Sequence, residues 1–187
     1  IILFNYVFQM SSLKETRLST ERIYKGRLLD VWKDKVELPD GKSSYREFIK
    51  HPGAVVIIPV LPDEKIGLIR QYRYPMGMEQ IELPAGKLDE SEPHLVTAGR
   101  ELEEEIGYKA GLLTEVTEIH PCIGYSDERM WIYLAEQLES TKTNTDQDEF
   151  IELMPTELEE AVEMVWSGKI TDVKTIIGIL WAHRLLH

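Results

Sequence analysis

Three carboxylates are spaced so that one face of a helix would carry all of them. Glu101, Glu104 and Glu105 lie three and four residues apart in the run RELEEEIG, and residues at these spacings share one side of an α-helix. Carboxylates this close repel one another unless a cation lies between them. An all-oxygen ligand set suits Mg²⁺ or Mn²⁺ better than zinc or copper. The spacing therefore predicts a site for a hard divalent cation.

Two neighbouring features would prepare such a site. Arg100 precedes Glu104 by four residues, so its guanidinium would pair with that carboxylate and orient it. Gly86 lets the backbone turn sharply and approach a ligand closely, which would offer the carbonyl oxygen of Ala85 as a further ligand. Acidic runs on helices are more often solvated faces, so the wider spacing has to decide between the two interpretations.

The wider spacing matches a complete motif, G-x5-E-x7-R-E-U-x-E-E-x-G-U, in which U is a bulky apolar residue. Tyr108 is the one unusual residue, since an aliphatic side chain is commoner there. The pattern is the Nudix box, and the chain resembles the Nudix hydrolases. The matching residues are Gly86, Glu92, Arg100, Glu101, Leu102, Glu104, Glu105, Gly107 and Tyr108.

The resemblance implies Mg²⁺-dependent hydrolysis of a diphosphate linkage, with Mn²⁺ as the alternative metal. In this family the helical glutamates hold two or three ions. Glu101 and Glu105 are the first candidates as metal ligands, followed by Glu104 and then by the Ala85 carbonyl. Glu104 is also expected in the catalytic machinery, together with Arg100.

Segments outside the box resemble the branch that contains ADP-ribose pyrophosphatases and nucleoside diphosphate sugar hydrolases. On that resemblance Arg46, Arg73, Glu82 and Tyr72 are expected to bind substrate. The two arginines have an alternative as surface salt bridges, and Tyr72 has one as a core residue. The segments are REFIKHPGAV, IRQYRY, ELPAG, GYSDER and GKITDVKT.

The same branch often takes its general base from a glutamate on a later loop. Glu149 is the predicted base, with Asp148 and Glu152 as alternatives, although polar loops are often acidic for solubility alone. One position departs from the ADP-ribose pattern: Ile123 stands sixteen residues after Gly107, where relatives carry proline. The departure makes GDP-mannose or another nucleoside diphosphate sugar a more plausible substrate.

The elements that position these residues can be predicted from hydrophobic period and turn signals. A helix should run from Pro93 to Gly107 and bury Leu95, Ala98, Leu102 and Ile106. Thr156 should open a second helix through a capping box, and a third should follow Asp172. Strands are expected in residues 22–51, with a turn at 39–41, and at residues 54–60, 66–72, 81–84, 112–120, 130–135 and 149–154.

These elements predict an α/β (α+β) fold, namely a Nudix-type α-β-α sandwich around a mixed sheet. Residues 1–20 are expected to be an N-terminal tail, in which Met10 is a candidate natural start and the apolar residues before it are expected to take no part in function. Residues 21–51 would form a β-rich dimerisation segment and residues 52–187 the hydrolase domain. The resemblance thus predicts a homodimer.

The amino-acid composition limits the kinds of molecule that this chain is expected to bind. The net charge of −12, from 21 basic and 33 acidic residues, argues against long nucleic acids. Cys122 is the one cysteine, which fits a reducing cytoplasm. The five histidines show no metal-ligand spacing and are expected to be structural or solvated. The apolar N-terminus is too short to cross a membrane.

Three functions follow. The first is hydrolysis of a small nucleoside diphosphate sugar, such as ADP-ribose or GDP-mannose, to a nucleoside monophosphate and a sugar phosphate. The second is a pyrophosphohydrolase acting on 5′-RNA ends or dinucleoside polyphosphates. The third is a nucleotide-sugar sensor without turnover, which should lack metal-site acids, and this chain has them all.

Overall fold

The computed structural model describes residues 12–89, 91–141 and 150–187. Within them the chain forms two compact units. One consists of the residues up to His51 together with Gly124–Asp127, and the other of Pro52–Ile123 together with Glu128–His187. The predicted metal ligands and Arg100 all belong to the second unit.

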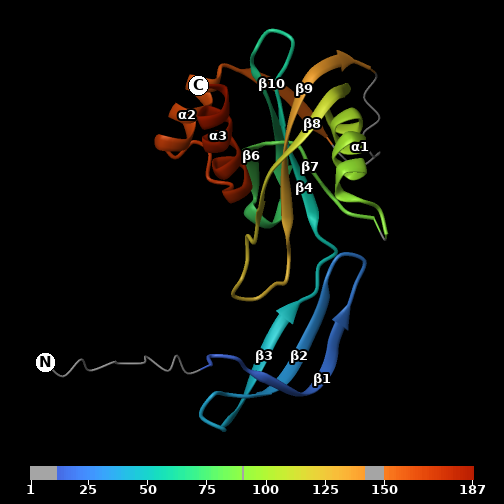
Figure 1. Ribbon diagram of the computed structural model, residues 1–187, viewed down its shortest axis with the longest axis vertical. Helices are drawn as coiled ribbons and strands as arrows, with labels where there is room; N and C mark the ends of the chain where they lie inside the picture. The colour runs from blue at the N-terminus through green and yellow to red at the C-terminus, as the bar shows by residue number, and fades with distance from the viewer. Residues whose placement is uncertain (1–11, 90, 142–149) are drawn as a thin grey trace, which may run out of the picture. The chain divides into compact units, whose positions relative to one another are not determined.

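The first unit is a three-stranded antiparallel sheet in the order β1-β2-β3 (Figure 1). Its strands are β1 (Thr16–Lys25), β2 (Asp30–Glu37) and β3 (Ser43–Ile49). Gly41 makes the expected turn between β2 and β3, with a φ of 82° that favours glycine. β1 begins inside the segment expected to be a tail (residues 1–20). Its residues are held by pairing with β2, and they show no alternation of apolar and polar residues that would have predicted a strand.

The second unit is built on a four-stranded sheet in the order β7-β4-β9-β8. β4 (Ala54–Pro59) runs parallel to β9 (Met130–Ser140), whereas β7 (Ala85–Lys87) and β8 (Tyr108–Ile119) pair antiparallel with their neighbours. All six residues of β4 are buried, as expected for a central strand covered on both faces.

A second sheet, in the order β10-β5-β6, lies beside the first. It consists of β5 (Ile66–Arg73), β6 (Met78–Glu82) and β10 (Ile151–Thr156), with a short 3₁₀ helix, η1 (Tyr74–Met76), between β5 and β6. Its strands are all antiparallel. β10 corresponds to the strand predicted at residues 149–154, but it is shifted by two residues toward the C-terminus.

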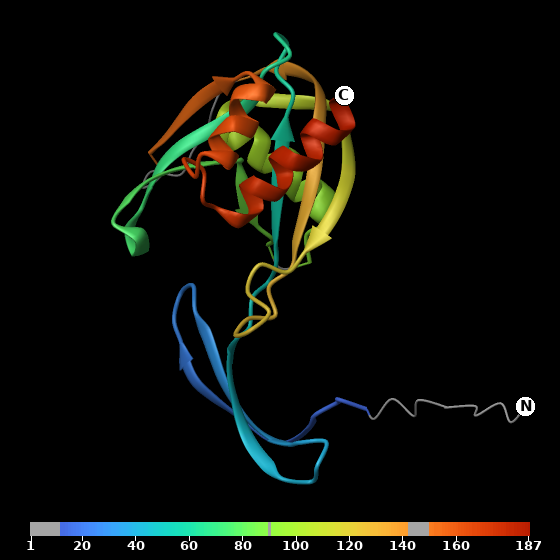
Figure 2. The same ribbon diagram turned by 90° about the vertical axis from the view of Figure 1, so that its left-hand side faces the viewer.

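Helices cover both faces of the central sheet, as Figures 1 and 2 show. α1 (His94–Ile106) packs Leu102 and Ile106 into one apolar cluster with Val55 and Ile57. On the other face, α2 (Leu158–Trp166) and α3 (Val173–Leu186) pack onto alternate residues of β4 such as Val56 and Ile58. The α-β-α sandwich around a mixed sheet is confirmed. No helix in the described ranges combines the length and apolar character needed to cross a bilayer.

Two local predictions about helices are wrong. Leu95 is 48% exposed, although it shares the helix face of Leu102 and Ile106, because it lies in the first turn of α1, at the end of that stripe. Thr156 does not open a capping box: it is the last residue of β10, and its hydroxyl donates to the Met154 carbonyl at 2.9 Å. α2 begins after Glu157, whose side chain makes no capping hydrogen bond.

Candidate metal and diphosphate site

α1 brings the predicted acids together next to the β7 backbone. Glu105 is buried, with 8% of its surface exposed, and its Oε2 accepts a hydrogen bond of 3.1 Å from the Ala85 amide. The Glu101 side chain is only 14% exposed, and that of Glu104 is 35% exposed. These carboxylates therefore share one partly buried face of the helix.

Gly86 is needed because of the space that Glu101 occupies. A Cβ atom built on Gly86 would lie 1.8 Å from Cδ of Glu101, which no real contact permits. Gly86 has no left-handed φ, so the sharp turn expected there is absent, and the glycine serves close approach alone. The Glu101 carboxylate consequently rests against the backbone that follows Ala85.

Arg100 orients the acids as predicted. Its guanidinium donates to Glu101 Oε1 at 2.9 Å, to Glu104 Oε2 at 2.8 Å and to Glu92 Oε2 at 3.2 Å. Burial by itself would lower the pKa of Arg100, but Glu92 and the other two carboxylates raise it overall. Hydrogen bonds from Thr97 and Arg100 lower the pKa of Glu92, so Arg100 and Glu92 both stay charged at neutral pH.

This donor set fits a hard divalent cation. In the contacts just described, three carboxylates share one guanidinium, and Glu105 adds a fourth negative charge nearby. Oxygen ligands of this kind and number suit Mg²⁺ or Mn²⁺. The Ala85 carbonyl belongs to the same stretch of backbone, and its role as a ligand stays a prediction.

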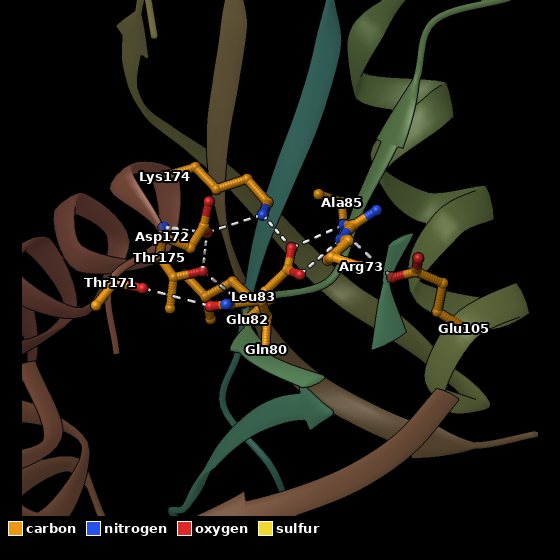
Figure 3. Close-up of polar contacts among 10 residues, drawn as sticks. All are labelled: Arg73, Gln80, Glu82, Leu83, Ala85, Glu105, Thr171, Asp172, Lys174 and Thr175. Carbon is orange, nitrogen blue, oxygen red and sulfur yellow. Dashed lines mark hydrogen bonds and ion pairs between the residues drawn. The ribbon is translucent and has the colours of Figure 1, made fainter. Parts of the chain in front are cut away.

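A second charged cluster lies next to Ala85 and Glu105 and involves two of the predicted substrate-binding residues (Figure 3). Arg73 makes a bidentate pair with Glu82, at 2.6 and 2.7 Å. Lys174 also pairs with Glu82, and its Nζ donates to Asp172 at 2.8 Å. Glu82 and Lys174 are buried, with 2% and 6% of their surfaces exposed.

The pKa values in this cluster follow from its geometry. Burial raises the pKa of Glu82, but the hydrogen bond from Arg73 and the charge of Lys174 lower it overall. The pKa of Arg73 is raised chiefly by its hydrogen bond to Glu82, and the negative charges of Asp172 and Glu105 act in the same direction. Arg73 is therefore a fixed cation within reach of the α1 acids.

Lys174 and Asp172 were missed as site residues, although the sequence held a signal. Lys174, Gly178 and Ala182 are spaced by four and lie on the buried side of α3. A lysine on the buried stripe of a helix needs a charged partner. Asp172 is the N-cap of α3 and accepts a hydrogen bond from the Thr175 amide at 3.1 Å, which fixes it beside Lys174.

The remaining predicted substrate residues lie elsewhere. Arg46 belongs to the first unit, where its Nε donates to Glu15 at 2.9 Å. Tyr72 is 58% exposed, so its interpretation as a core residue is wrong. It lines an open pocket of about 300 Å³ with Arg70 and Phe150. The substrate roles of Arg46 and Tyr72 stay predictions.

Of the three candidates for the general base, only Glu152 lies among the described residues. Glu149 and Asp148 lie outside the described residues. Glu152 pairs with Arg70 across the β10–β5 ladder. Because residues alternate between the faces of a strand, Arg70 and Glu152 lie on the opposite face from Arg73, whose own face carries the Glu82 pair. This arrangement places Glu152 away from the Arg73–Glu82 pair, on the face of the sheet that also carries Tyr72.

Comparison with known proteins agrees with this fold and site. A family model described as "NUDIX domain" matches residues 50–173, and one described as "Nucleoside diphosphate sugar hydrolase N-terminal domain" matches residues 15–49. The chain therefore belongs to the Nudix hydrolases and is an enzyme of that family.

Particular relatives refine the comparison. The chain is 42% identical to a Bacillus subtilis protein named "ADP-ribose pyrophosphatase", covering 91% of this chain and 93% of the relative. It is 40% identical to the "Methanol dehydrogenase activator" of Bacillus methanolicus, covering 89% and 91%. A crystal structure of an "ADP compounds hydrolase" superimposes with a TM-score of 0.83, covering 94% and 96% of the two chains. Its 23% identity supports the fold alone.

Proposed function

We propose that this enzyme hydrolyses the diphosphate linkage of a small nucleoside diphosphate sugar in a reaction that requires Mg²⁺. ADP-ribose is the first candidate substrate and GDP-mannose the second. The observation that carries the proposal is the set of α1 carboxylates beside the β7 backbone. Arg100 orients them through hydrogen bonds, and Gly86, which has no side chain, leaves the space that Glu101 occupies. The relative named for ADP-ribose supports the choice of substrate.

Glu101, Glu104 and Glu105, with the Ala85 carbonyl, would hold Mg²⁺ or Mn²⁺. A divalent ion bound there supplies neutralisation of the diphosphate and a water of lowered pKa. Arg100 keeps the carboxylates of Glu101 and Glu104 in fixed positions, because it donates to both from one planar group.

The chain's other residues would bind substrate and move the proton. Arg73 would contact a diphosphate oxygen, since Glu82 fixes the plane of its guanidinium while Arg73 itself is 42% exposed. Glu149 would accept a proton from the attacking water. Tyr72 would stack on the base, and Arg46 would contact the substrate's ribose or diphosphate.

A substrate panel tests the proposal. The purified protein with Mg²⁺ is incubated separately with ADP-ribose, GDP-mannose, ADP-glucose, a diadenosine polyphosphate and triphosphorylated RNA. The expected result is cleavage of at least one nucleotide sugar to a nucleoside monophosphate and a sugar phosphate. Cleavage of the dinucleotide or the RNA alone would replace the proposal with the second function, and binding without cleavage of any substrate would favour a sensor.

We also propose a homodimer formed through the first unit, in a cytoplasmic protein. β1 is the edge strand of its sheet, and Leu18, Ile23 and Tyr24 on it are at least half exposed. An exposed apolar edge strand is a site for pairing with another chain. Light scattering should give twice the chain mass, and Ile23→Glu should yield a monomer. A monomeric wild-type protein would contradict this.

A second candidate function comes from the relative named as an activator. In that case the protein, supplied with Mg²⁺, would raise the rate of a methanol dehydrogenase. Adding wild-type protein and the Glu105→Gln variant to such an assay distinguishes activation that needs the proposed hydrolysis from activation by contact alone.

A further inference from the structure

We propose that Glu159, His183 and His187 form a Zn²⁺ site that fastens the end of α3 to the start of α2. One ligand atom from each residue lies within 4.8 Å of the other two. Nε2 of His187 is 3.0 Å and Nε2 of His183 is 3.5 Å from the same Oε1 of Glu159. This three-residue group is called the α2–α3 cluster below.

The spacing of His183 and His187 is typical of metal ligands on a helix. His183 and His187 lie four residues apart at the end of α3, so both imidazoles project from one face of that helix. The prediction that the histidines show no metal-ligand spacing fails for this pair, whereas their role as structural or solvated residues stays a prediction. The third candidate ligand, Glu159, comes from α2 and is not adjacent in sequence.

Two of the three distances between ligand atoms fit tetrahedral zinc. Zinc binds imidazole nitrogen and carboxylate oxygen at about 2.0–2.2 Å, which places neighbouring ligand atoms of a tetrahedron roughly 3.3 Å apart. The two distances to Glu159 bracket this value. Two imidazoles and one carboxylate form a donor set that zinc accepts, and its fourth position would remain for water.

The local field also favours a cation. Both histidines lie in or next to the last turn of α3, where the helix dipole carries its negative end. Without an ion, the same contacts would be two exposed pairs, and such pairs add little to stability. A bound ion would instead cross-link two helices that both pack on the apolar cluster of β4.

This site is independent of the proposed hydrolysis. α2 and α3 cover one face of the central sheet, and α1, with Glu101 and Glu105, covers the other (Figure 1). Zinc binding at the α2–α3 cluster can therefore succeed or fail whatever the substrate panel shows.

Zinc titration of the whole chain, purified without a histidine tag, tests the proposal. Saturating Mg²⁺ occupies the α1 acids, and calorimetry then measures Zn²⁺ binding to the wild-type protein and to His187→Ala and Glu159→Gln. One zinc per chain is expected. Each variant should bind at least about 10–100-fold more weakly, since even the loss of an outer-shell partner has that effect.

His120→Ala is the matched control. His120 is also a half-exposed histidine beside a glutamate, 3.4 Å from Glu118, but among the described residues it belongs to no group of three potential metal ligands. It should bind zinc like the wild type. Equal zinc affinity and stoichiometry in wild type, His187→Ala and His120→Ala would overturn the proposal.

Cobalt provides a readout that the α1 acids would not imitate. Co²⁺ in a tetrahedral nitrogen–oxygen site absorbs visible light much more strongly than octahedral Co²⁺ in an all-oxygen site. The wild type and Glu105→Gln should both show the strong absorption, and His183→Ala should lose it. A strong signal lost in Glu105→Gln but kept in His183→Ala would assign the metal to α1 and overturn the site. Because the three cluster residues are half-exposed or exposed, their variants should fold normally.

Discussion

The two charged clusters of the second unit differ in their charge balance. Around Glu82, two cations face two anions, and Glu82 and Lys174 at its centre are almost completely buried. Beside α1, Arg100 pairs with four carboxylates that remain partly accessible, those of Asp89, Glu92, Glu101 and Glu104. In the balanced and buried cluster, every carboxylate has a cationic partner within the protein, and the pairing with Glu82 positions Arg73. An unbalanced and accessible cluster would be neutralised by a cation from solution, which is why we propose it as the metal site.

Removing one charge from the balanced cluster should have the largest effect. Lys174→Met leaves the buried Glu82 with only one of its two cations, and breaking a buried pair costs about 3–5 kcal/mol. The free energy of unfolding, measured in urea, should fall by that amount. Lys169→Met removes an exposed lysine from the preceding loop and should change it by less than about 0.5 kcal/mol.

A double variant sharpens this result. Adding Glu82→Gln to Lys174→Met removes the buried charge that was left with one partner, so part of the lost stability should return. If the two losses were simply additive, the Lys174–Glu82 contact would carry no coupling, and the description of a balanced cluster would fail.

Removing one charge from the unbalanced cluster should affect activity and leave stability unchanged. Glu105→Gln should lower kcat/KM by at least about 100-fold, because losing a ligand exceeds the roughly 10–100-fold effect of losing an outer-shell partner. Glu103→Gln is the matched control: it lies on the same helix but is exposed on another side. Comparable losses in the two variants would show that the α1 carboxylates act only through overall charge.

Filling the space against which Glu101 rests should have a smaller effect on activity. Gly86→Ala puts a methyl group where the Glu101 carboxylate lies, so about a tenfold loss is expected, together with a higher Mg²⁺ concentration for half-maximal activity. In Gly99→Ala, the new Cβ would meet only an ordinary contact of 3.7 Å with Leu113. That variant should keep full activity and gain up to about 1 kcal/mol of stability.

The pH dependence of stability should report on Glu82. Its pKa is lower in the folded protein than in the unfolded chain, so its contribution to stability is complete above the unfolded pKa. That contribution is lost as the pH falls through the folded pKa. In Glu82→Gln the acid side of the stability profile should be flatter than in the wild type, measured by urea unfolding at a series of pH values. Identical slopes would mean that Glu82 is not held ionised by its partners.

The smallest effect is expected on the far face of the second sheet. Glu152→Gln removes an exposed pair with Arg70, which should change stability by less than about 1 kcal/mol and leave kcat unchanged. A large loss of kcat would make Glu152 the general base.

The sequence by itself determined the α1 site, because helical periodicity is local: residues three and four apart must share a face wherever the helix lies. Thus Glu101, Glu104, Glu105 and Arg100 could be grouped from their spacing, and the buried runs of the central sheet could be recognised. The capping box at Thr156 failed because strand pairing extended β10 through that residue.

Tertiary structure decided the contacts between residues far apart in the chain. Lys174 meets Glu82 across 92 residues, and Glu159 meets two histidines of another helix. The need for glycine at position 86 follows from the tertiary packing of Glu101 against the backbone of that residue. Such contacts depend on how α2 and α3 pack on the sheet, and α1 on β7. No period in the sequence encodes that packing, because it results from many apolar contacts acting together.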